Sequence, residues 1–312
     1  MKISKNLLVS FSVIFILLFV VFKCSAVKKD QIIIGTYEVY KSEAYNYVKE
    51  ALENGFTNID TSKDYYNQNE VGMAIRDFES KGGNNHVYVI AKFSIPNSCR
   101  EDVFVGGFED ELKEYIKSQI DEAREILGHV DEFIVHKELP GNTSFSDVAQ
   151  AFGAIKKNEL YKDIKFGVST ITADEMEKII FRKLIKNIQV VQNPYWYGSD
   201  FLVNLFGMGD KVYCYCKNYG IKYEAYRALG RGRLVNERHF SPAVLLQHSI
   251  NKGYIPIVKA TGQKHLSELV EKVDEKIALP EVKWDNENST FNIQILNDGQ
   301  LDVINSKQYW YK

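Results

Sequence analysis

Four side chains of acid–base type stand where apolar runs of the sequence end. Asp60 directly follows the apolar run Phe56–Ile59, and Tyr65 stands five positions further on in a polar stretch. Lys92 and His136 each close a later apolar run. A phenol has a pKa of about 10 and is a poor acid at neutral pH unless a nearby cation lowers that pKa. Brought together, the four side chains could deliver a proton to an oxygen on which negative charge develops.

Bringing these side chains together requires a fold that gathers the ends of consecutive strands. From Gln31 onward, strand patterns alternate with amphipathic helix patterns, and the strands are expected at 32–37, 56–59, 87–92, 132–136, 164–169, 188–192, 221–226 and 254–258. Such strand–helix units, filling about 250 residues, are typical of a closed parallel barrel with its chemistry on one rim. A doubly wound open sheet would carry G-x-G-x-x-G after its first strand, and that fingerprint is absent. We therefore predict an α/β fold, a (β/α)8 TIM barrel, over residues 31–279.

The stretch from Phe56 to Gly72 carries a recognisable motif, Asp-Thr-Ala-x-x-Tyr-x-Asn-Glu-x-x-Val-Gly. The residues in register are Asp60, Thr61, Tyr65, Asn67, Val71 and Gly72. Ser62 stands for the Ala and Gln68 for the Glu. By this motif the chain resembles the aldo-keto reductase family, and the resemblance extends over about 33–270.

The resemblance implies a catalytic tetrad of Asp60, Tyr65, Lys92 and His136. Tyr65 would be the proton donor, and Lys92, held by Asp60, would lower the pKa of the phenol. His136 would orient the carbonyl oxygen of the substrate. The Trp-Pro that follows the His in the family is replaced by Lys-Glu-Leu-Pro at 137–140, so the resemblance leaves the substrate unspecified beyond a small carbonyl compound.

The resemblance also implies a nicotinamide site at the ends of later strands. In GVST, Ser169 would bind the carboxamide, with Thr170 in place of the usual Asn. Gln192 would complete that contact. Tyr226 would stack on the nicotinamide ring, and the Leu229-Gly230 pair that follows also matches the family.

A further segment, IPIVKATGQKH, is similar to the part of the family that holds the adenosine 2′-phosphate. Lys259 takes the Lys position, Ala260 stands for the Ser, and His265 falls where an Arg is common. One fixed cation remains, which favours NADP(H) over NAD. Because no side chain donates hydride, the cofactor must supply it.

Three functions remain open at this point. The first is an NADP(H)-dependent oxidoreductase that reduces an aldehyde or ketone to an alcohol. The second is a membrane-tethered, cofactor-binding regulatory subunit similar to the potassium-channel β-subunits, with little or no turnover. The third is a scaffold that has lost the cofactor, and the intact tetrad argues against it because packing does not demand all four residues.

The N-terminus has the pattern of a targeting segment. Lys2 and Lys5 precede an almost wholly apolar run at 7–22, and Cys24-Ser25-Ala26 suits a signal-peptidase site. Residues 1–26 are therefore expected to be a signal peptide or a membrane anchor. This places the protein in the secretory pathway or on a membrane, with association through residues 7–22.

Composition excludes some other classes. A formal net charge of −2 gives no electrostatic footprint for nucleic acid. Four cysteines in 312 residues are not a disulfide framework, and Cys214 and Cys216 are expected to be two buried thiols. The tail at 280–312 is expected to pack on the barrel, and we expect a monomer. Sequons at Asn142 and Asn288 would matter if the barrel is lumenal.

Overall fold

The computed structural model describes residues 27–82, 86–96, 108–136, 139, 143–195, 210–236, 241–271, 281–285, 290–297 and 300–305. The predicted targeting segment 1–26 and the sequons at Asn142 and Asn288 lie outside these residues. Within the described ranges, no helix has the length and apolar character needed to cross a membrane.

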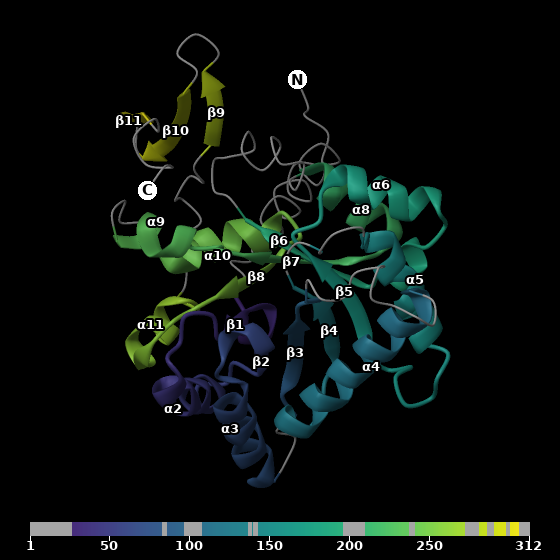
Figure 1. Ribbon diagram of the computed structural model, residues 1–312. Helices are drawn as coiled ribbons and strands as arrows, with labels where there is room; N and C mark the ends of the chain where they lie inside the picture. Colours follow the sequence, from purple (N-terminus) through teal and green to yellow (C-terminus); the bar gives the residue numbers. More distant parts are fainter. Residues whose placement is uncertain are drawn as a thin grey trace, which may run out of the picture.

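The described strands confirm the predicted barrel. β1 to β8 run parallel in chain order, and β8 pairs with β1 to close the sheet (Figure 1). The strands are β1 (Ile33–Gly35), β2 (Asn58–Ser62), β3 (Tyr88–Phe93), β4 (Glu132–Val135), β5 (Lys165–Ser169), β6 (Val190–Pro194), β7 (Lys222–Tyr226) and β8 (Ile255–Val258). In this register Ser62 is the partner of Lys92, and Ser169 is the partner of Gln192. The predicted chemistry therefore lies at the carboxyl ends of neighbouring strands.

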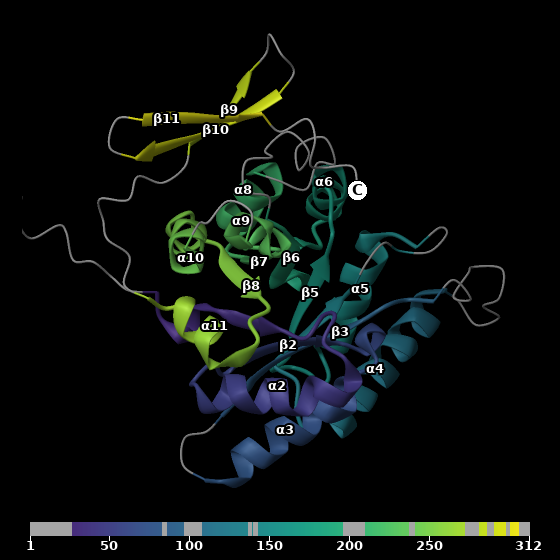
Figure 2. The same cartoon turned by 90° about the vertical axis from the view of Figure 1, so that its left-hand side faces the viewer.

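Helices surround the barrel, as the two views show (Figures 1 and 2). They are α2 (Lys41–Glu53), α3 (Gln68–Ser80), α4 (Phe108–Leu127), α5 (Phe145–Ile155), α6 (Ala173–Phe181), α8 (Asp210–Tyr219), α9 (Arg233–Asn236), α10 (Pro242–Asn251) and α11 (Gly262–Glu268). Capping boxes at Ser144 and Thr172 start α5 and α6. Each helix that follows a strand returns the chain to the starting edge of the barrel, so all the strands end on the same rim.

Two apolar clusters hold these layers together. The larger lies between the helices and the barrel wall, where Phe93 stacks on Phe133 at a centroid distance of 4.6 Å. The smaller lies inside the barrel and comprises Ile33, Ile90, Ile134, Val190 and Ile257. The interior is thus a packed core.

Charged side chains also lie inside the barrel, toward the end where the strands begin. Lys222 Nζ lies 2.9 Å from Glu132 Oε1 and 2.6 Å from Glu224 Oε1, and both carboxylates are fully buried. Burial, with the nearby Glu132 charge, raises the pKa of Glu224 to about 7, although Lys222 opposes the shift.

Two expectations about the rest of the chain have different outcomes. Cys216 is buried but Cys214 is exposed, so the prediction of two buried thiols is wrong for Cys214. Residues two apart on a helix do not share a face, which is the physical reason.

In the tail, β9 (Glu281–Asp285), β10 (Thr290–Asn297) and β11 (Gln300–Asn305) form a separate antiparallel sheet. Packing of this sheet on the barrel stays a prediction.

Candidate active site

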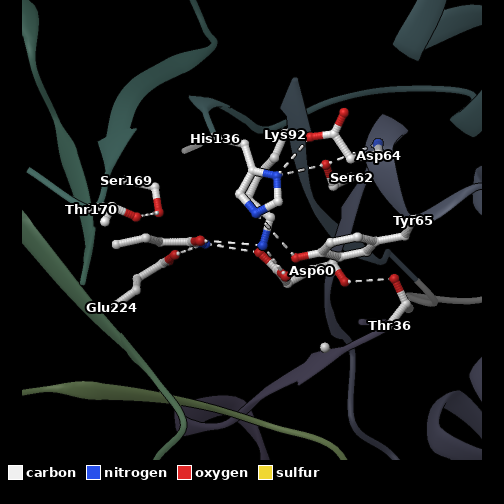
Figure 3. A network of polar contacts seen from close by, with 12 residues as sticks. Thr36, Asp60, Ser62, Asp64, Tyr65, Lys92, His136, Ser169, Thr170 and Glu224 are labelled. Carbon is white, nitrogen blue, oxygen red and sulfur yellow. Dashed lines mark hydrogen bonds and ion pairs between the residues drawn. The ribbon is translucent and has the colours of Figure 1, made fainter. Parts of the chain in front are cut away.

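The predicted tetrad converges on the rim where β2, β3 and β4 end (Figure 3). Asp60 lies in β2, Lys92 lies in β3, and His136 follows β4 directly. Tyr65 is brought over them by the 3-10 turn η2 (Lys63–Tyr65), which continues β2. Parallel pairing of these strands places side chains that are far apart in sequence within hydrogen-bond reach.

Lys92 and Asp60 form a buried ion pair beneath the rim. Lys92 Nζ lies 2.6 Å from Asp60 Oδ1, and the two side chains are 5% and 2% exposed. Burial acts to lower the pKa of Lys92, but the Asp60 carboxylate and the Tyr65 oxygen outweigh it and hold this pKa above its ordinary value. The ammonium is therefore a fixed positive charge at neutral pH.

Tyr65 lies above this ammonium and beside His136. Lys92 Nζ is 5.1 Å from the centroid of the Tyr65 ring, and the Tyr65 hydroxyl is 3.5 Å from His136 Nε2. Burial raises the pKa of Tyr65 to about 12, and the opposing effect of Lys92 is smaller. Lys92 thus acts in the expected direction, but the expected net lowering is not found because desolvation of the phenolate dominates.

His136 has a second contact that sequence reasoning missed. Its Nδ1 lies 2.9 Å from Asp64 Oδ2 and 3.1 Å from Ser62 Oγ. The same Asp64 oxygen accepts a 2.6 Å hydrogen bond from Ser94 Oγ, and Ser94 Oγ also lies 3.1 Å from the carbonyl oxygen of His136. An ionised carboxylate can only accept, so Asp64 favours the imidazole tautomer with its proton on Nδ1.

This tautomer decides how His136 meets Tyr65. Burial lowers the pKa of His136, although the Asp64 hydrogen bond opposes the shift, so the ring is neutral at neutral pH. With Nδ1 protonated, Nε2 carries the lone pair and accepts from the Tyr65 hydroxyl. The side chains of Asp64, His136 and Tyr65 therefore form one continuous chain of hydrogen bonds at the rim.

We expect Asp64→Asn to break this chain without breaking the barrel. Loss of the carboxylate that favours the imidazolium should lower the pKa of His136 further, and kcat for carbonyl reduction should fall about tenfold. ¹⁵N NMR of the histidine ring reads the tautomer directly, and a pH profile of kcat reads its consequence. Asp77→Asn, which replaces the carboxylate that accepts a 2.6 Å hydrogen bond from Tyr45 by an amide, is the matched control. An Nδ1–H tautomer and a pH profile both unchanged in Asp64→Asn would contradict the assignment.

The sequence did carry a signal for Asp64 and Ser94. Asp64 directly precedes Tyr65, and Ser94 stands two positions after Lys92. An acidic residue in the turn that presents a catalytic phenol has no packing role, so it could have been considered as a partner for His136.

Three of the predicted nicotinamide residues meet at the ends of β5 and β7. Ser169 Oγ lies 3.4 Å from Thr170 Oγ1, and Thr170 Oγ1 lies 3.4 Å from the Tyr226 hydroxyl. These contacts are long for hydroxyl pairs, so the groups can exchange them for contacts with a ligand. Hydroxyls both donate and accept, as a carboxamide requires, and the half-buried Tyr226 ring offers a face for stacking.

Two residues in this region have left-handed backbone. Thr170 has φ 62° and Arg227 has φ 62°. A β-branched residue in this region is a genuine outlier, and such strain tends to gather at binding sites. Asn, the usual residue of the resembled family at position 170, adopts this conformation at lower cost.

Gln192 lies next to Ser169 but its amide is turned toward the buried charges. Its Nε2 donates to Asp60 Oδ2 at 2.8 Å and to Glu224 Oε2 at 2.7 Å, and Lys92 Nζ approaches its Oε1 at 3.4 Å. In this arrangement Gln192 positions the Asp60–Lys92 pair. The predicted contact with the nicotinamide would require it to give up one of these bonds.

Leu229, predicted beside Tyr226 at the cofactor site, follows β7 and is half-buried against the core. The residues predicted to hold the adenosine end, Lys259 and His265, lie after β8. Lys259 Nζ pairs with Glu38 Oε2 at 3.9 Å, with both side chains exposed at 42% and 61%. His265, in α11, is exposed, and its Nδ1 lies 2.7 Å from the carbonyl oxygen of Thr261. A long, exposed ion pair is weak, so Lys259 fits the role of a phosphate ligand.

The remaining motif residues are structural. Asn67 is fully buried, and its Nδ2 donates to the carbonyl oxygens of Thr36 and Val39 at 3.0 and 2.9 Å, which fixes the loop after β1. A Cβ on Gly72 would overlap the carbonyl oxygen of Ile126 in α4, so only glycine lets α3 approach so closely. The motif therefore combines catalytic residues with the packing that positions them.

A closed (β/α)8 barrel with Tyr, Lys, His and Asp converging on its C-terminal rim defines the class of barrel oxidoreductases. The aldo/keto reductase family model matches residues 31–284, and the chain belongs to that family.

Known relatives agree with this assignment. Methylglyoxal reductase DkgB of Escherichia coli O157:H7 is 28% identical over 244 residues, which cover 75% of this chain and 83% of that protein. Glyoxal reductase of Bacillus subtilis is 27% identical over 249 residues, which cover 75% of this chain and 80% of that protein. A crystal structure of an aldo/keto reductase from Brucella melitensis shares the fold, with a TM-score of 0.58 at 22% identity over 81% of this chain and 94% of that one.

Proposed function

We propose that this protein reduces a small aldehyde or ketone to an alcohol with NADPH as the reductant. The observation that carries the proposal is the convergence of Tyr65 and His136 over the buried Lys92–Asp60 pair. The family supports an oxidoreductase, and the preference for NADPH and the kind of carbonyl are our inferences.

The reaction needs a proton at the carbonyl oxygen while hydride arrives at the carbon. Tyr65 delivers that proton from its hydroxyl, and the Lys92 ammonium stabilises the phenolate that remains. The Tyr65 hydroxyl lies 3.5 Å from His136 Nε2, a long contact that it can exchange for donation to the substrate oxygen. Because Nε2 carries a lone pair in the neutral ring, it can take up a proton from solvent after turnover and pass that proton to the phenolate.

The cofactor supplies the hydride when bound. Ser169 and Thr170 would hold its carboxamide, and Tyr226 would stack on its nicotinamide ring. Lys259 would meet the 2′-phosphate, which distinguishes NADP(H) from NAD. The loose hydroxyl contacts and the weak Lys259–Glu38 pair fit these roles because each can be exchanged at low cost.

The proposed substrate class is a 2-oxoaldehyde or a similarly small aldehyde. The names of two relatives, methylglyoxal reductase and glyoxal reductase, point in this direction. Tyr37, 51% exposed and edge-on to Tyr65 at 5.2 Å between ring centroids, provides an aromatic wall beside the reacting group. A panel of methylglyoxal, glyoxal, longer aldehydes and ketones, assayed by NADPH oxidation, tests the class.

The same assay separates the enzyme from a regulatory subunit. An enzyme gives many turnovers of NADPH per protein molecule, with a rate that saturates in the carbonyl substrate. A cofactor-binding regulatory subunit binds NADPH, as followed by its fluorescence, but turns over no member of the panel. Binding without turnover would therefore replace the first proposal with the second.

A substitution that relieves the backbone strain at position 170 should increase the affinity for NADPH. We expect Thr170→Asn to stabilise the protein by about 1 kcal/mol, since Asn adopts the left-handed conformation more readily. We also expect a lower Kd for NADPH, because the amide adds a donor and an acceptor for the carboxamide. Thermal unfolding and fluorescence titration measure the two effects, with Thr172→Asn, a change of helix cap, as the control. A less stable variant with weaker NADPH binding would contradict this account of Thr170.

A further inference from the structure

A second cluster of chemically active side chains lies at the opposite end of the barrel, where β3 and β4 begin. Glu79 is in the last turns of α3, His86 precedes β3, and His129 and Asp131 lie between α4 and β4. One ligating atom from each of Glu79, His86 and His129 lies within 4.8 Å of the others. No step of the proposed reaction uses these residues.

We propose that Glu79, His86 and His129, with Asp131 beside them, form a Zn²⁺ site that joins α3, β3 and β4. Two imidazole nitrogens and carboxylate oxygens are a ligand set that Zn²⁺ accepts. With neutral imidazoles the two carboxylates bring two negative charges, which balance a divalent cation.

The carboxylates are oriented as metal ligands usually are. Glu79 Oε1 accepts from the Val87 backbone N–H at 3.0 Å, and Asp131 Oδ2 accepts from the Val89 N–H at 2.7 Å. One oxygen of each carboxylate is thus fixed to the backbone, that of Glu79 at the residue before β3 and that of Asp131 within β3. Both oxygens of each carboxylate also face a histidine. Glu79 Oε2 lies 3.9 Å from His129 Nδ1 and Glu79 Oε1 lies 3.7 Å from His86 Nδ1. Asp131 Oδ1 lies 3.6 Å from His86 Nε2 and Asp131 Oδ2 lies 3.5 Å from His129 Nε2.

His129 is held in the same manner. Its Nε2 lies 2.8 Å from the carbonyl oxygen of Val87, so Nε2–H donates to the backbone and Nδ1 is left for a ligand. A metal-binding histidine commonly donates its other N–H in this way, which fixes both the tautomer and the ring orientation. The exposed His86 ring, 66% accessible, leaves the site open to ions from solvent.

The spacing of three of the four nitrogen–oxygen pairs fits a shared ion better than direct hydrogen bonds. Their distances of 3.6, 3.7 and 3.9 Å exceed those of charge-assisted hydrogen bonds, and the fourth pair, His129 Nε2 with Asp131 Oδ2, is 3.5 Å apart. Two ligands bound at ~2.1 Å to a tetrahedral ion lie about 3.4 Å apart. The ligating atoms of Glu79, His86 and His129 lie within 4.8 Å of one another, so binding would draw them together. The His86 and His129 rings stack at 5.0 Å between centroids, and two protonated rings so placed would repel each other.

The competing interpretation is a network of ion pairs without metal. In it His129 is protonated, consistent with a pKa raised to about 8, chiefly by its hydrogen bond with Asp131. The two interpretations differ in a measurable way, because a metal must displace that proton whereas an ion-pair network binds no metal.

Isothermal titration of the chelator-treated, tag-free chain with ZnCl₂ tests the proposal. We expect one equivalent to bind, with a Kd at least about 100-fold weaker in both His86→Ala and His129→Gln. Lys81→Ala, which removes an exposed pair with Glu53, is the control and should bind like wild type. Circular dichroism verifies that each variant is folded, and His86→Ala is the decisive one because that side chain is exposed.

Thermal unfolding provides a second test, which does not depend on the heat of binding. Zn²⁺ should raise the Tm of the wild type and of Lys81→Ala, since a ligand that binds only the folded state stabilises it. The Tm of His86→Ala should not respond. Absence of Zn²⁺ binding by the wild type, or binding that survives in either histidine variant, would overturn the proposal in favour of the ion-pair network or of another site. This outcome is independent of carbonyl reduction.

Discussion

Tyr65→Phe is expected to lower kcat for carbonyl reduction by about 10²-fold or more while leaving NADPH binding intact. The phenol is the group within reach of both His136 and the Lys92 ammonium, so its loss removes the proton donor. The ring remains, and with it the edge contact with Tyr37 at 5.2 Å. Steady-state kinetics with NADPH and the best aldehyde of the panel, together with NADPH fluorescence titration, measure the two quantities.

The neighbouring residue provides a matched control for this substitution. Tyr66 is 84% exposed, so Tyr66→Phe should behave like wild type. Because burial raises the pKa of Tyr65 to about 12, its phenol stays protonated through neutral and mildly alkaline pH, and reduction should not fall there on its account. If Tyr65→Phe kept the wild-type rate, another group would have to be the proton donor.

Lys92→Met is expected to reduce both activity and stability. The variant lacks the charge that stabilises the developing phenolate, so kcat should fall by about 10²-fold or more. It also leaves the Asp60 carboxylate, 2% exposed, without its cation. Breaking a buried ion pair from one side typically costs about 3–5 kcal/mol, which urea denaturation would measure as a lower free energy of unfolding.

The double variant Asp60→Asn/Lys92→Met separates the two effects. With both charges removed, most of the lost stability should return, because no uncompensated charge remains buried. Activity should not return, since the phenolate still lacks a cation. A double variant as unstable as Lys92→Met alone would show that the loss arises from packing of the Lys92 side chain, and a recovered kcat would remove Lys92 from the mechanism.

The barrel and the tetrad could be predicted from the sequence because both follow from local patterns. Asp60, Lys92 and His136 each end an apolar run, and parallel strands must end on the same rim. Gly72 and Asn67 could be read as motif positions, and the structure supplies their reasons in the contact of α3 with Ile126 and in the bonds of Asn67 to the loop after β1. The prediction that Cys214 and Cys216 are both buried was wrong for Cys214, because helical geometry, rather than composition, decides which side chain is exposed.

The electrostatics of the site could not be predicted in the same way. Asp64 and His136 are 72 positions apart, and only the folded rim brings them to 2.9 Å. The direction of the Tyr65 pKa shift depends on whether desolvation, which raises the pKa, outweighs Lys92, which lowers it. The spacing of residues along the sequence does not reveal this balance. Gln192 was expected to face the cofactor, yet its amide is used by Asp60 and Glu224, a network assembled across the barrel.

The central claim is hydride transfer from the nicotinamide to a carbonyl carbon at this rim. The most direct measurement uses NADPH deuterated at C4 in separate incubations of its two stereoisomers with methylglyoxal or the best substrate of the panel. Mass spectrometry of the alcohol should find one deuterium on the carbinol carbon from one stereoisomer and none from the other. Tyr65→Phe should yield about one hundredth of the labelled alcohol, or less, over the same time. An alcohol without deuterium from both stereoisomers, or no alcohol at all from the wild type, would contradict the account.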